Sequence, residues 1–253
     1  MRYLILCTGL LLSLALKAQL TDSVKIEGHY RTFHFNKPGV GPNASIVFAL
    51  HGSGGNGKAV MRNTAKLEAI AKQENIVIVY PDGYKHYWNE CRRMADTPPN
   101  KEDINEEKFF IAMIDYFKKK YKTDSRKVFV VGTSGGGQMA YKLGMTIPHR
   151  IRAITAIIAN LPDSANMDCV PSGKPVPVMI VNGTDDPVNP YAGGMMQAGS
   201  LTLGTVLSTE KTFVYWSDIA GYTGEPIKTI YPDTDPTDGK IIERYTYKEH
   251  GKP

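Results

Sequence analysis

Ser134 stands where a serine side chain could act as a nucleophile. It lies at the centre of GTSGG at 132–136, after a four-residue apolar run and before an apolar pattern of helical period. This order predicts a buried strand, a tight turn and a helix. Such a turn strains the backbone of the serine, and its glycines let neighbouring chain approach without a Cβ clash. A purely structural turn is the alternative, because glycine-rich serine turns are common.

A glycine-rich loop upstream could stabilise the negative charge that forms when a serine attacks a carbonyl group. Residues 45–50 read as a short buried strand that runs directly into HGSGGNG at 51–57. Glycines let the chain come close to a ligand, and backbone amides can donate to an oxyanion without any special side chain. A phosphate-binding loop is the alternative. It is disfavoured because the run lacks the Gly-Lys-Ser/Thr ending of a P-loop.

A serine hydroxyl is a weak nucleophile until a base takes its proton, and a third group usually orients that base. Residues 175–182 read as a late strand that leads into GTDDPVNP. Asp185 and Asp186 in this loop are the candidate carboxylates for the orienting role. His250 is the single histidine that follows them in the sequence.

The segments between these loops carry strand and helix patterns in alternation. Residues 106–121 have apolar side chains at helical spacing, 59–73 are predicted as a further helix, and 25–35 as a leading antiparallel strand. Continuous apolar runs predict buried strands at 45–50, 76–80, 128–131 and 175–182, and residues 151–159 are either a buried strand or a short strand with a turn. Strands that alternate with helices imply a mostly parallel sheet with helices on both faces. No repeat or composition break indicates a second domain.

Five stretches together resemble a known enzyme family. The chain is similar to the secreted α/β-hydrolase esterases grouped with polyhydroxybutyrate depolymerases, feruloyl esterases and acetylxylan esterases (carbohydrate esterase family 1-like), in which G-x-S-x-G forms the nucleophile turn. The resemblance covers most of the chain after residue 18. The matching stretches are LHGSGGNG at 50–57, YPDG at 80–83, WN at 88–89, DSRKVFVVGTSGGGQMA at 124–140 and PVPVMIVNGTDDPVNPYAGG at 175–194.

The resemblance implies an α/β-hydrolase fold and two-step hydrolysis of carboxylic esters through an acyl-serine, with no metal or cofactor. Ser134 is the implied nucleophile. Asp186, the fourth residue of a Gly-Thr-x-Asp run, is the implied acid in preference to Asp185. The implied oxyanion donors are the backbone amides of Ser53 and Gly135.

The long polar loop at 84–106 has no period of its own, and such loops are often functional. Trp88 and Asn89 within it predict a wall of the substrate-binding site. The alternative is an aromatic plug that tethers the loop. The acyl group depends on this loop and on the region 191–240, whose chemistry the sequence does not reveal.

The sequence differs from the family that it resembles in the position expected for the histidine base. In that family the base lies in a late Gly-Gly-His-Thr/Ser-Trp stretch, which this sequence does not contain. His250 lies in EHGKP at 249–253, after an alternating segment that reads as an exposed strand. We therefore expect that the chain stops before its base and before the last strand of the sheet, which leaves an edge prone to association. The alternative is that His250 itself is the base.

Residues 1–18 predict a secretory signal peptide, which leaves 19–253 as a single esterase domain. A positive start precedes a leucine-rich run at 4–16, and Ala18 provides a small residue for cleavage. An uncleaved anchor is the alternative, but the run is short for a membrane span. The protein is therefore expected to be secreted or periplasmic, without stable membrane insertion after cleavage.

The cysteines and the net charge limit which metals and macromolecules the chain could bind. Cys91 and Cys169 remain after residue 18, and in an oxidising compartment they could pair, although the sequence leaves this open. Two cysteines without a neighbouring histidine or further cysteine make a poor metal site. The net charge of +5 is too small to indicate nucleic-acid binding, and no basic stripe with interleaved aromatics is present.

Three functional hypotheses follow from these patterns. The first is a secreted serine esterase that acts on plant-polysaccharide esters or polyester-like substrates. The second is a non-catalytic carbohydrate-binding relic of the esterase fold, motivated by the missing histidine. The third is a secreted serine peptidase, because the same catalytic groups also cleave amides.

Overall fold

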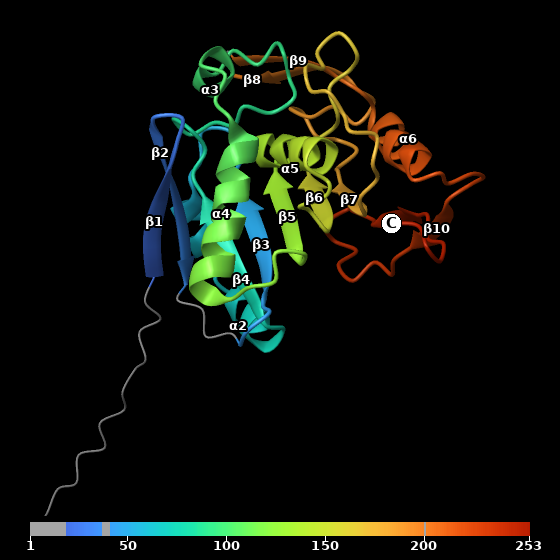
Figure 1. Ribbon diagram of the computed structural model, residues 1–253. Helices are drawn as coiled ribbons and strands as arrows, with labels where there is room; N and C mark the ends of the chain where they lie inside the picture. Colours follow the sequence, from blue (N-terminus) through green and yellow to red (C-terminus); the bar gives the residue numbers. More distant parts are fainter. Residues whose placement is uncertain (1–18, 37–40, 200) are drawn as a thin grey trace, which may run out of the picture.

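The computed structural model describes residues 19–36, 41–199 and 201–253. The predicted signal peptide at 1–18 lies outside these residues. Within them a central sheet carries helices on both faces, and two separate hairpins extend beyond it (Figure 1). This layered arrangement is the α/β fold that the alternating patterns predict.

The central sheet has seven strands in the order β1-β2-β4-β3-β5-β6-β7. β1 and β2 form an antiparallel hairpin, and β2 is also antiparallel to β4. The neighbours from β4 to β7 are parallel, so their carboxyl ends meet at one edge of the sheet. The strands are β1 Gln19–Ile26, β2 His29–Asn36, β3 Ser45–Leu50, β4 Ile76–Pro81, β5 Val128–Thr133, β6 Ala153–Ile157 and β7 Val178–Val181.

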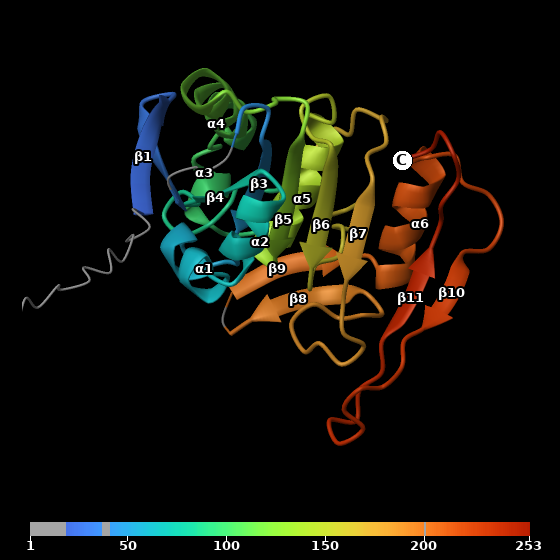
Figure 2. The same cartoon turned by 90° about the horizontal axis from the view of Figure 1, so that it is seen from below.

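Side chains of β3 and β4 alternate between two apolar layers because successive strand residues point to opposite faces. Ile46 and Phe48 enter a large layer that α4, α5 and α6 cover. Ile78 and Tyr80 enter a smaller layer with α1 and α2, which lie on the other side of the sheet from α4 (Figure 2). The helices are α1 Gly57–Asn63, α2 Leu67–Gln73, α3 Pro98–Lys101, α4 Glu106–Tyr121, α5 Gly135–Thr146 and α6 Thr209–Ile219.

The predicted leading strand at 25–35 is two strands instead of one. The chain reverses at Glu27 and Gly28, whose φ angles of 47° and 92° are both positive, and β1 pairs with β2 across this turn. The prediction was wrong because alternating aromatic and β-branched residues continue on both sides of the turn. Periodicity alone does not reveal a reversal of this kind.

The predicted helix at 59–73 is also two elements, α1 and α2. The amide and the hydroxyl of Thr64 both donate to Val60 O, at 2.9 and 2.8 Å, where α1 ends. Leu67 and Ile70, whose spacing indicated one buried helical face, are 49% and 53% exposed. A single helix is therefore wrong. Between α1 and α2 the Leu67 and Glu68 amides donate to carbonyls three residues back instead of four, and an apolar period does not show such an interruption.

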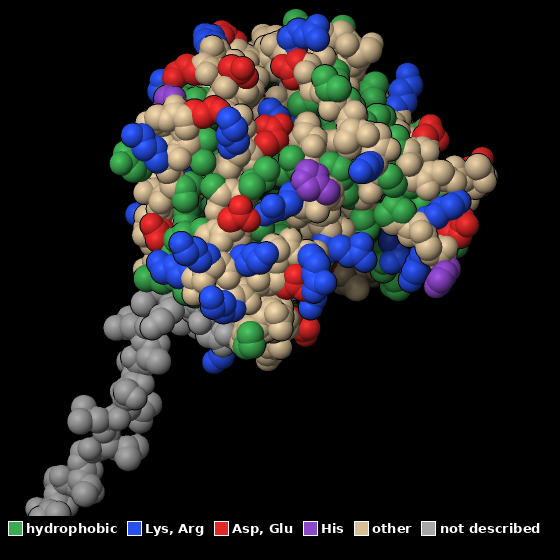
Figure 3. Space-filling view, viewed as in Figure 1, with side chains coloured by type: hydrophobic (Ala, Val, Ile, Leu, Met, Phe, Trp, Pro, Cys, Tyr) green, Lys and Arg blue, Asp and Glu red, His purple; other side chains and the backbone are tan. Residues whose placement is uncertain are grey.

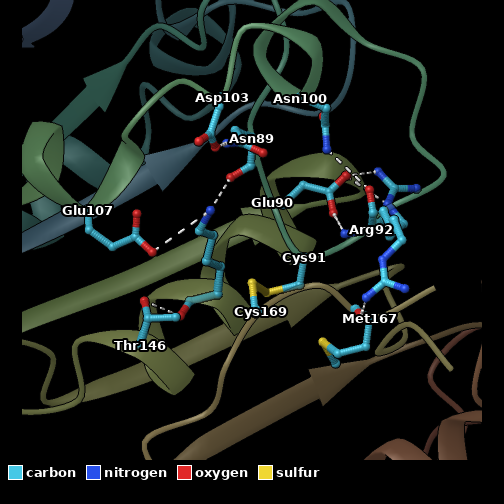
Figure 4. The surroundings of a disulfide bond; sticks show 12 residues. Asn89, Glu90, Cys91, Arg92, Asn100, Asp103, Glu107, Thr146, Met167 and Cys169 are labelled. Atoms are coloured by element: carbon cyan, nitrogen blue, oxygen red, sulfur yellow. Dashed lines mark hydrogen bonds and ion pairs between the residues drawn. A yellow bond between two sulfur atoms is a disulfide. The ribbon is translucent and has the colours of Figure 1, made fainter. Parts of the chain in front are cut away.

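The polar loop at 84–106 is fastened by a disulfide bond. Cys91 and Cys169 are bonded, with their Cα atoms 5.0 Å apart, which confirms the pairing that the sequence leaves open. Beside this bond Glu90 and Arg92 form a buried ion pair (Figure 4). The loop therefore packs as part of the core and covers α5, which is buried along nearly its whole length.

Two hairpins lie outside the central sheet: β8 Gly194–Ala198 with β9 Leu201–Val206, and β10 Ile227–Ile230 with β11 Glu243–Thr246. β11 confirms the exposed strand predicted before His250, but it pairs with β10 rather than with the central sheet. β7 ends the order of the central sheet, and its Met179 and Val181 are 59% and 41% exposed. Among the described residues, one side of β7 therefore has no partner strand.

Basic side chains gather on the lower part of the face shown in Figure 3. Lys118, Lys119 and Lys120 occupy the last turn of α4, where cations complement the helix dipole. They are exposed, as expected of a solvated helix end. Among the described residues, no helix has the length and apolarity needed to cross a membrane.

Candidate active site

Ser134 lies at a sharp turn between β5 and α5, which confirms the predicted strand, turn and helix. Its φ of 54° and ψ of −119° form a conformation that residues with a side chain rarely adopt. The Ser134 amide donates to Ile157 O at 2.8 Å, and the Gln138 amide donates to Ser134 O at 3.0 Å. These bonds hold the strained conformation, and strain held in this way is concentrated at functional sites.

Two positions beside Ser134 must be glycine, because other backbone segments pass too close to them for a side chain. A Cβ on Gly132 would lie 2.0 Å from Gly136 O, and a Cβ on Gly136 would lie 2.6 Å from Leu50 O. No side chain fits at either position. The glycines therefore let the turn pack directly against the end of β3.

The loop that follows β3 lies beside the serine. A Cβ on Gly52 would be 3.4 Å from Ser134 Cβ, and a Cβ on Gly135 would be 3.1 Å from the Ser53 amide nitrogen. Among the described residues, the amides of Ser53 and Gly135 find no hydrogen-bond acceptor. Two available donors next to a serine hydroxyl can stabilise a tetrahedral oxyanion. The structure thus places Ser53, Gly135 and Ser134 together.

His51 anchors this loop through its ring. Its Nε2 accepts a hydrogen bond from the Gly83 amide at 2.8 Å, so Nδ1 carries the proton and donates to Gly52 O at 2.7 Å. The ring is 2% exposed, and burial lowers the pKa of His51. His51 is therefore a neutral structural residue whose two nitrogens are both occupied by backbone groups.

Asp82 holds the other end of the same loop. Its Oδ1 accepts from the Gly57 amide at 2.7 Å, and its Oδ2 lies 2.9 Å from His34 Nε2. Burial alone would raise the pKa of Asp82, but the hydrogen bonds with His34 and Gly57 outweigh it and hold the pKa below its usual value. Sequence reasoning matched YPDG at 80–83 to the family but gave Asp82 no role, because its partners come from other elements.

Trp88 and Asn89, predicted to line a substrate-binding wall, are buried instead. Trp88 is 2% exposed, and its Nε1 donates to His51 O at 2.9 Å. Asn89 is 7% exposed, and Lys142 of α5 donates to its carbonyl oxygen at 2.8 Å. Both residues tie the loop at 84–106 to the rest of the site. The predicted wall of the substrate-binding site is therefore replaced by the alternative, residues that fix the loop in place. The sequence could not decide between the two, because it does not show which way an aromatic ring in a loop faces.

Asp186 lies in the loop after β7 and has a fixed carboxylate. Its Oδ1 accepts hydrogen bonds from the amides of Val188 and Asn189, both at 2.8 Å. Its Oδ2 has no such partner in the part of the chain that the structure describes, which leaves that oxygen available for an imidazole. Asp185 is exposed. These contacts favour Asp186 over Asp185 as the acid.

The turns that follow β5, β6 and β7 form one edge of the site. Ser134 follows β5, and the Asp186 loop follows β7, with β6 between them. Directly after β6, Ile158 has a φ of 48°, which is unusual for a β-branched residue, and its amide donates to Val181 O at 2.8 Å. Open α/β sheets bind their ligands at this carboxyl edge.

His250, the alternative base, is remote from the loop at 182–190 that contains Asp186, called the acid loop below. Next to it, Lys252 Nζ donates to Gly221 O at 2.8 Å, just beyond the C-terminal end of α6. The opposite end of α6 begins at Thr209, whose hydroxyl accepts from Asn182 after β7. Helix α6 has 11 residues and is about 16 Å long. Figure 2 likewise shows the C-terminus beside α6, away from the carboxyl ends of β6 and β7.

The described residues provide a nucleophile, oxyanion donors and a carboxylate, but no base. All six histidines belong to the described part of the chain, and none forms a hydrogen bond with Ser134. Within the same residues, no group of three or more His, Cys, Asp or Glu is placed to hold a metal ion.

Comparison with known proteins assigns the chain to a family. The profile of the phospholipase/carboxylesterase family matches residues 36–213, which include the serine turn and the acid loop. The chain belongs to this family. Its fold is that of the α/β-hydrolases, and the family's enzymes are carboxylic ester hydrolases.

Curated relatives of this family member are esterases by name. It is 26% identical over 175 residues to a putative esterase of Nocardia uniformis subsp. tsuyamanensis, covering 67% of this chain and 49% of that protein. It is 28% identical to a bifunctional acetylxylan esterase/xylanase of Neocallimastix patriciarum, covering 68% and 24%. Feruloyl esterase B of Neurospora crassa is 29% identical, with 58% and 48% covered. The chain thus spans about half or less of the length of these relatives.

A solved structure supports the fold. The native crystal structure of a protein named pOPH aligns with this family member at a TM-score of 0.53 and 15% sequence identity. The alignment covers 74% of this chain and 72% of that chain. At this identity the similarity shows a shared α/β-hydrolase architecture.

Proposed function

We propose that the protein is a secreted serine carboxylesterase. Ser134 Oγ attacks the acyl carbon of an ester, its proton passes to a base, and the amides of Ser53 and Gly135 stabilise the oxyanion. Collapse of this intermediate releases the alcohol with that proton and leaves an acyl-serine. Water then attacks the acyl-serine and releases the acid. Asp186 orients and stabilises the imidazole base in both steps.

One observation carries this proposal above the others. The strained Ser134 lies where the Ser53 amide approaches Gly135, with a Cβ on Gly135 only 3.1 Å from that nitrogen. A nucleophile and two amide donors at one point suit a carbonyl that becomes tetrahedral. A structural turn would not need two backbone donors left without acceptors.

The substrates that we propose are feruloyl or acetyl esters on plant polysaccharides, or polyesters such as polyhydroxybutyrate. The names of the acetylxylan and feruloyl esterase relatives support the first class. The peptidase and carbohydrate-binding alternatives have no comparable support among these relatives. Ethyl ferulate, acetylated xylan and a hydroxybutyrate oligomer distinguish the ester classes in one set of turnover assays.

Secretion is supported by the disulfide and by the predicted signal peptide at 1–18. Disulfides such as Cys91–Cys169 persist in oxidising compartments. Fractionation of cells that express the full sequence tests this part. Protein found in the periplasm or medium, shortened by about the length of residues 1–18, would agree with it.

Ester turnover by the 253-residue chain and by Ser134→Ala tests the catalytic proposal. Because the described histidines do not reach Ser134, the assays contain imidazole as an external base. We expect p-nitrophenyl acetate hydrolysis above the Ser134→Ala background and no cleavage of a peptide anilide. Equal turnover by the two proteins would refute the proposed nucleophile.

A further inference from the structure

Four hydrogen bonds in series connect Ser134 with Asp186. The Gln138 amide donates to Ser134 O at 3.0 Å, and Gln138 Nε2 donates to Asn160 O at 2.6 Å. The Asn160 amide donates to Asn189 Oδ1 at 3.1 Å, and the Asn189 amide donates to Asp186 Oδ1 at 2.8 Å. The three connecting residues are 1%, 0% and 2% exposed, respectively. The series therefore runs through the interior of the protein.

The side chain of Asn160 ties the acid loop to two further elements. Its Nδ2 donates to Pro190 O at 3.1 Å, on the far side of the loop from Asp186. Its Oδ1 accepts from Asn182 Nδ2 at 2.8 Å, after β7, and from Thr209 Oγ1 at 3.0 Å, at the start of α6. One fully buried amide thus fastens the acid loop, β7 and α6 together.

Burying amide side chains is unfavourable unless they are hydrogen-bonded, so such a network indicates a requirement beyond filling space. The end of β6 is already fixed by other bonds, because Ile158 donates to Val181 O and the Ala159 amide donates to Asn182 Oδ1. The side chains of Gln138 and Asn189 connect α5 with the acid loop through the backbone of Asn160. The side chain of Asn160 adds a second hold on the same loop, its bond to Pro190 O. Both side-chain polar atoms of Asn160 are hydrogen-bonded, whereas Gln138 Oε1 and Asn189 Nδ2 are buried without a partner among the described residues. Hydrogen bonds between buried polar groups favour one arrangement of the elements that they join.

We propose that Asn160 and Asn189 are positioning residues that hold the Asp186 carboxylate in register with the Ser134 turn. This inference rests on the proposed function, because only there do Asp186 and Ser134 act on one substrate. Neither asparagine touches the reacting atoms. Both act through Asp186, because a carboxylate displaced by about 1 Å orients an imidazole poorly.

Amide hydrogen exchange measured by NMR tests the positioning directly. The variants are Asn160→Ala and Asn189→Ala. Tyr141→Phe is the matched control, since it removes a buried hydrogen bond to Ala159 O, next to Asn160, without contacting the acid loop. We expect the Val188 amide, which donates to Asp186, to exchange at least tenfold faster in both variants. It should stay within twofold of the wild-type rate in the control.

Kinetics then separate positioning from general loss of structure. With imidazole as the base, we expect kcat for p-nitrophenyl acetate to fall at least tenfold in Asn160→Ala and Asn189→Ala, with KM within twofold. Tyr141→Phe should keep the wild-type kcat. Unchanged exchange of the Val188 amide, or the same kcat in both asparagine variants as in the control, would overturn the inference. If Asn160→Ala does not fold by circular dichroism, Asn160→Ser replaces it and Asn189→Ala still decides.

The Ser134→Ala variant distinguishes this inference from the function on which it rests. If Ser134→Ala loses turnover and the two asparagine variants keep it, only the positioning role is wrong. If Ser134→Ala keeps wild-type turnover, the proposed function itself is wrong, whatever the exchange rates show.

Discussion

At the scale of single residues, the candidate site combines a strained serine backbone with two backbone amides that can donate hydrogen bonds to a ligand. Ser134 adopts a positive φ, and the amides of Ser53 and Gly135 are available beside it. Asp186 is oriented by two backbone amides, so one of its oxygens is left for an imidazole. In the proposed function each of these groups is oriented before any substrate binds, and such preorganisation lowers the barrier of acyl transfer.

Added imidazole is expected to raise ester turnover by the 253-residue chain about tenfold or more, because no histidine of the described residues forms a hydrogen bond with Ser134 and an external base can take its proton. The measurement is the initial rate of p-nitrophenyl acetate hydrolysis at increasing imidazole concentration. Rates of Ser134→Ala are subtracted, since imidazole hydrolyses this ester by itself.

His250→Ala serves as the control for the base. Its rates should match those of the unmodified chain with and without imidazole, because His250 lies beyond the far end of α6. A large loss of imidazole-independent turnover in His250→Ala would instead show that His250 reaches the site and acts as the base.

Stability is expected to fall between pH 8 and pH 5, in part because of His51. Burial lowers the pKa of His51 below the reference value of 6.5, so the unfolded chain takes up a proton at a higher pH than the folded protein. The unfolded state binds more protons in this window, and stability is lost as the pH falls through it. Urea midpoints at pH 8 and pH 5 measure the change.

His51→Gln isolates this contribution. Its side-chain oxygen can still accept from the Gly83 amide, but the side chain does not titrate. We expect a smaller difference between the two urea midpoints than in the wild type. An identical difference would mean that His51 does not contribute to the pH dependence.

At the scale of elements, three loops at the carboxyl edge are fixed by bonds that cross between elements. His51 and Asp82 hold the loop after β3, and the Cys91–Cys169 bond holds the polar loop over α5. Asn160 holds the acid loop. Loops held by a rigid scaffold are where binding and catalytic groups usually occur.

Gly132→Ala is expected to destabilise the protein by about 1–3 kcal/mol and to remove ester turnover. The new Cβ would lie 2.0 Å from Gly136 O, so the serine turn has to move. Gly41→Ala is the matched control, because its nearest neighbour is an ordinary contact at 3.9 Å. Urea unfolding and turnover of both variants check this, and equal behaviour of the two would contradict the required close approach.

Removal of the disulfide in a Cys91→Ala/Cys169→Ala variant should lower the free energy of unfolding. The bond closes a loop over a separation of 78 residues, for which the chain-entropy estimate is about 4.5 kcal/mol. Urea unfolding measures the difference. The wild type treated with a reductant should behave like the variant, and a variant as stable as the oxidised wild type would show that the bond adds nothing.

At the scale of the whole molecule, local patterns predicted the parallel sheet, the helix at 106–121 and the serine turn, because each is encoded by adjacent residues. The inward direction of Trp88 and the bond between Asn160 and Asn189 were not predictable. They depend on partners distant in the sequence, and buried polar residues carry no periodic signal. For the same reason YPDG at 80–83 could be matched without showing what Asp82 holds.

The edge strand β7 is expected to make the chain associate at high concentration. Met179 on it is 59% exposed, and an edge without a partner strand in the described part of the chain offers backbone groups to another strand. Sedimentation velocity should show oligomers that dissociate on dilution, and Met179→Lys should reduce them. A strictly monomeric wild type at the highest concentration would contradict this expectation.

The central claim is that Ser134 is the nucleophile, and covalent labelling tests it most directly. The 253-residue chain is incubated with a fluorophosphonate and imidazole, and the adduct is located by peptide mass spectrometry. We predict one adduct, on the peptide that contains Ser134, and none in Ser134→Ala. No adduct in the folded wild type, or an adduct that persists in Ser134→Ala, would contradict the claim.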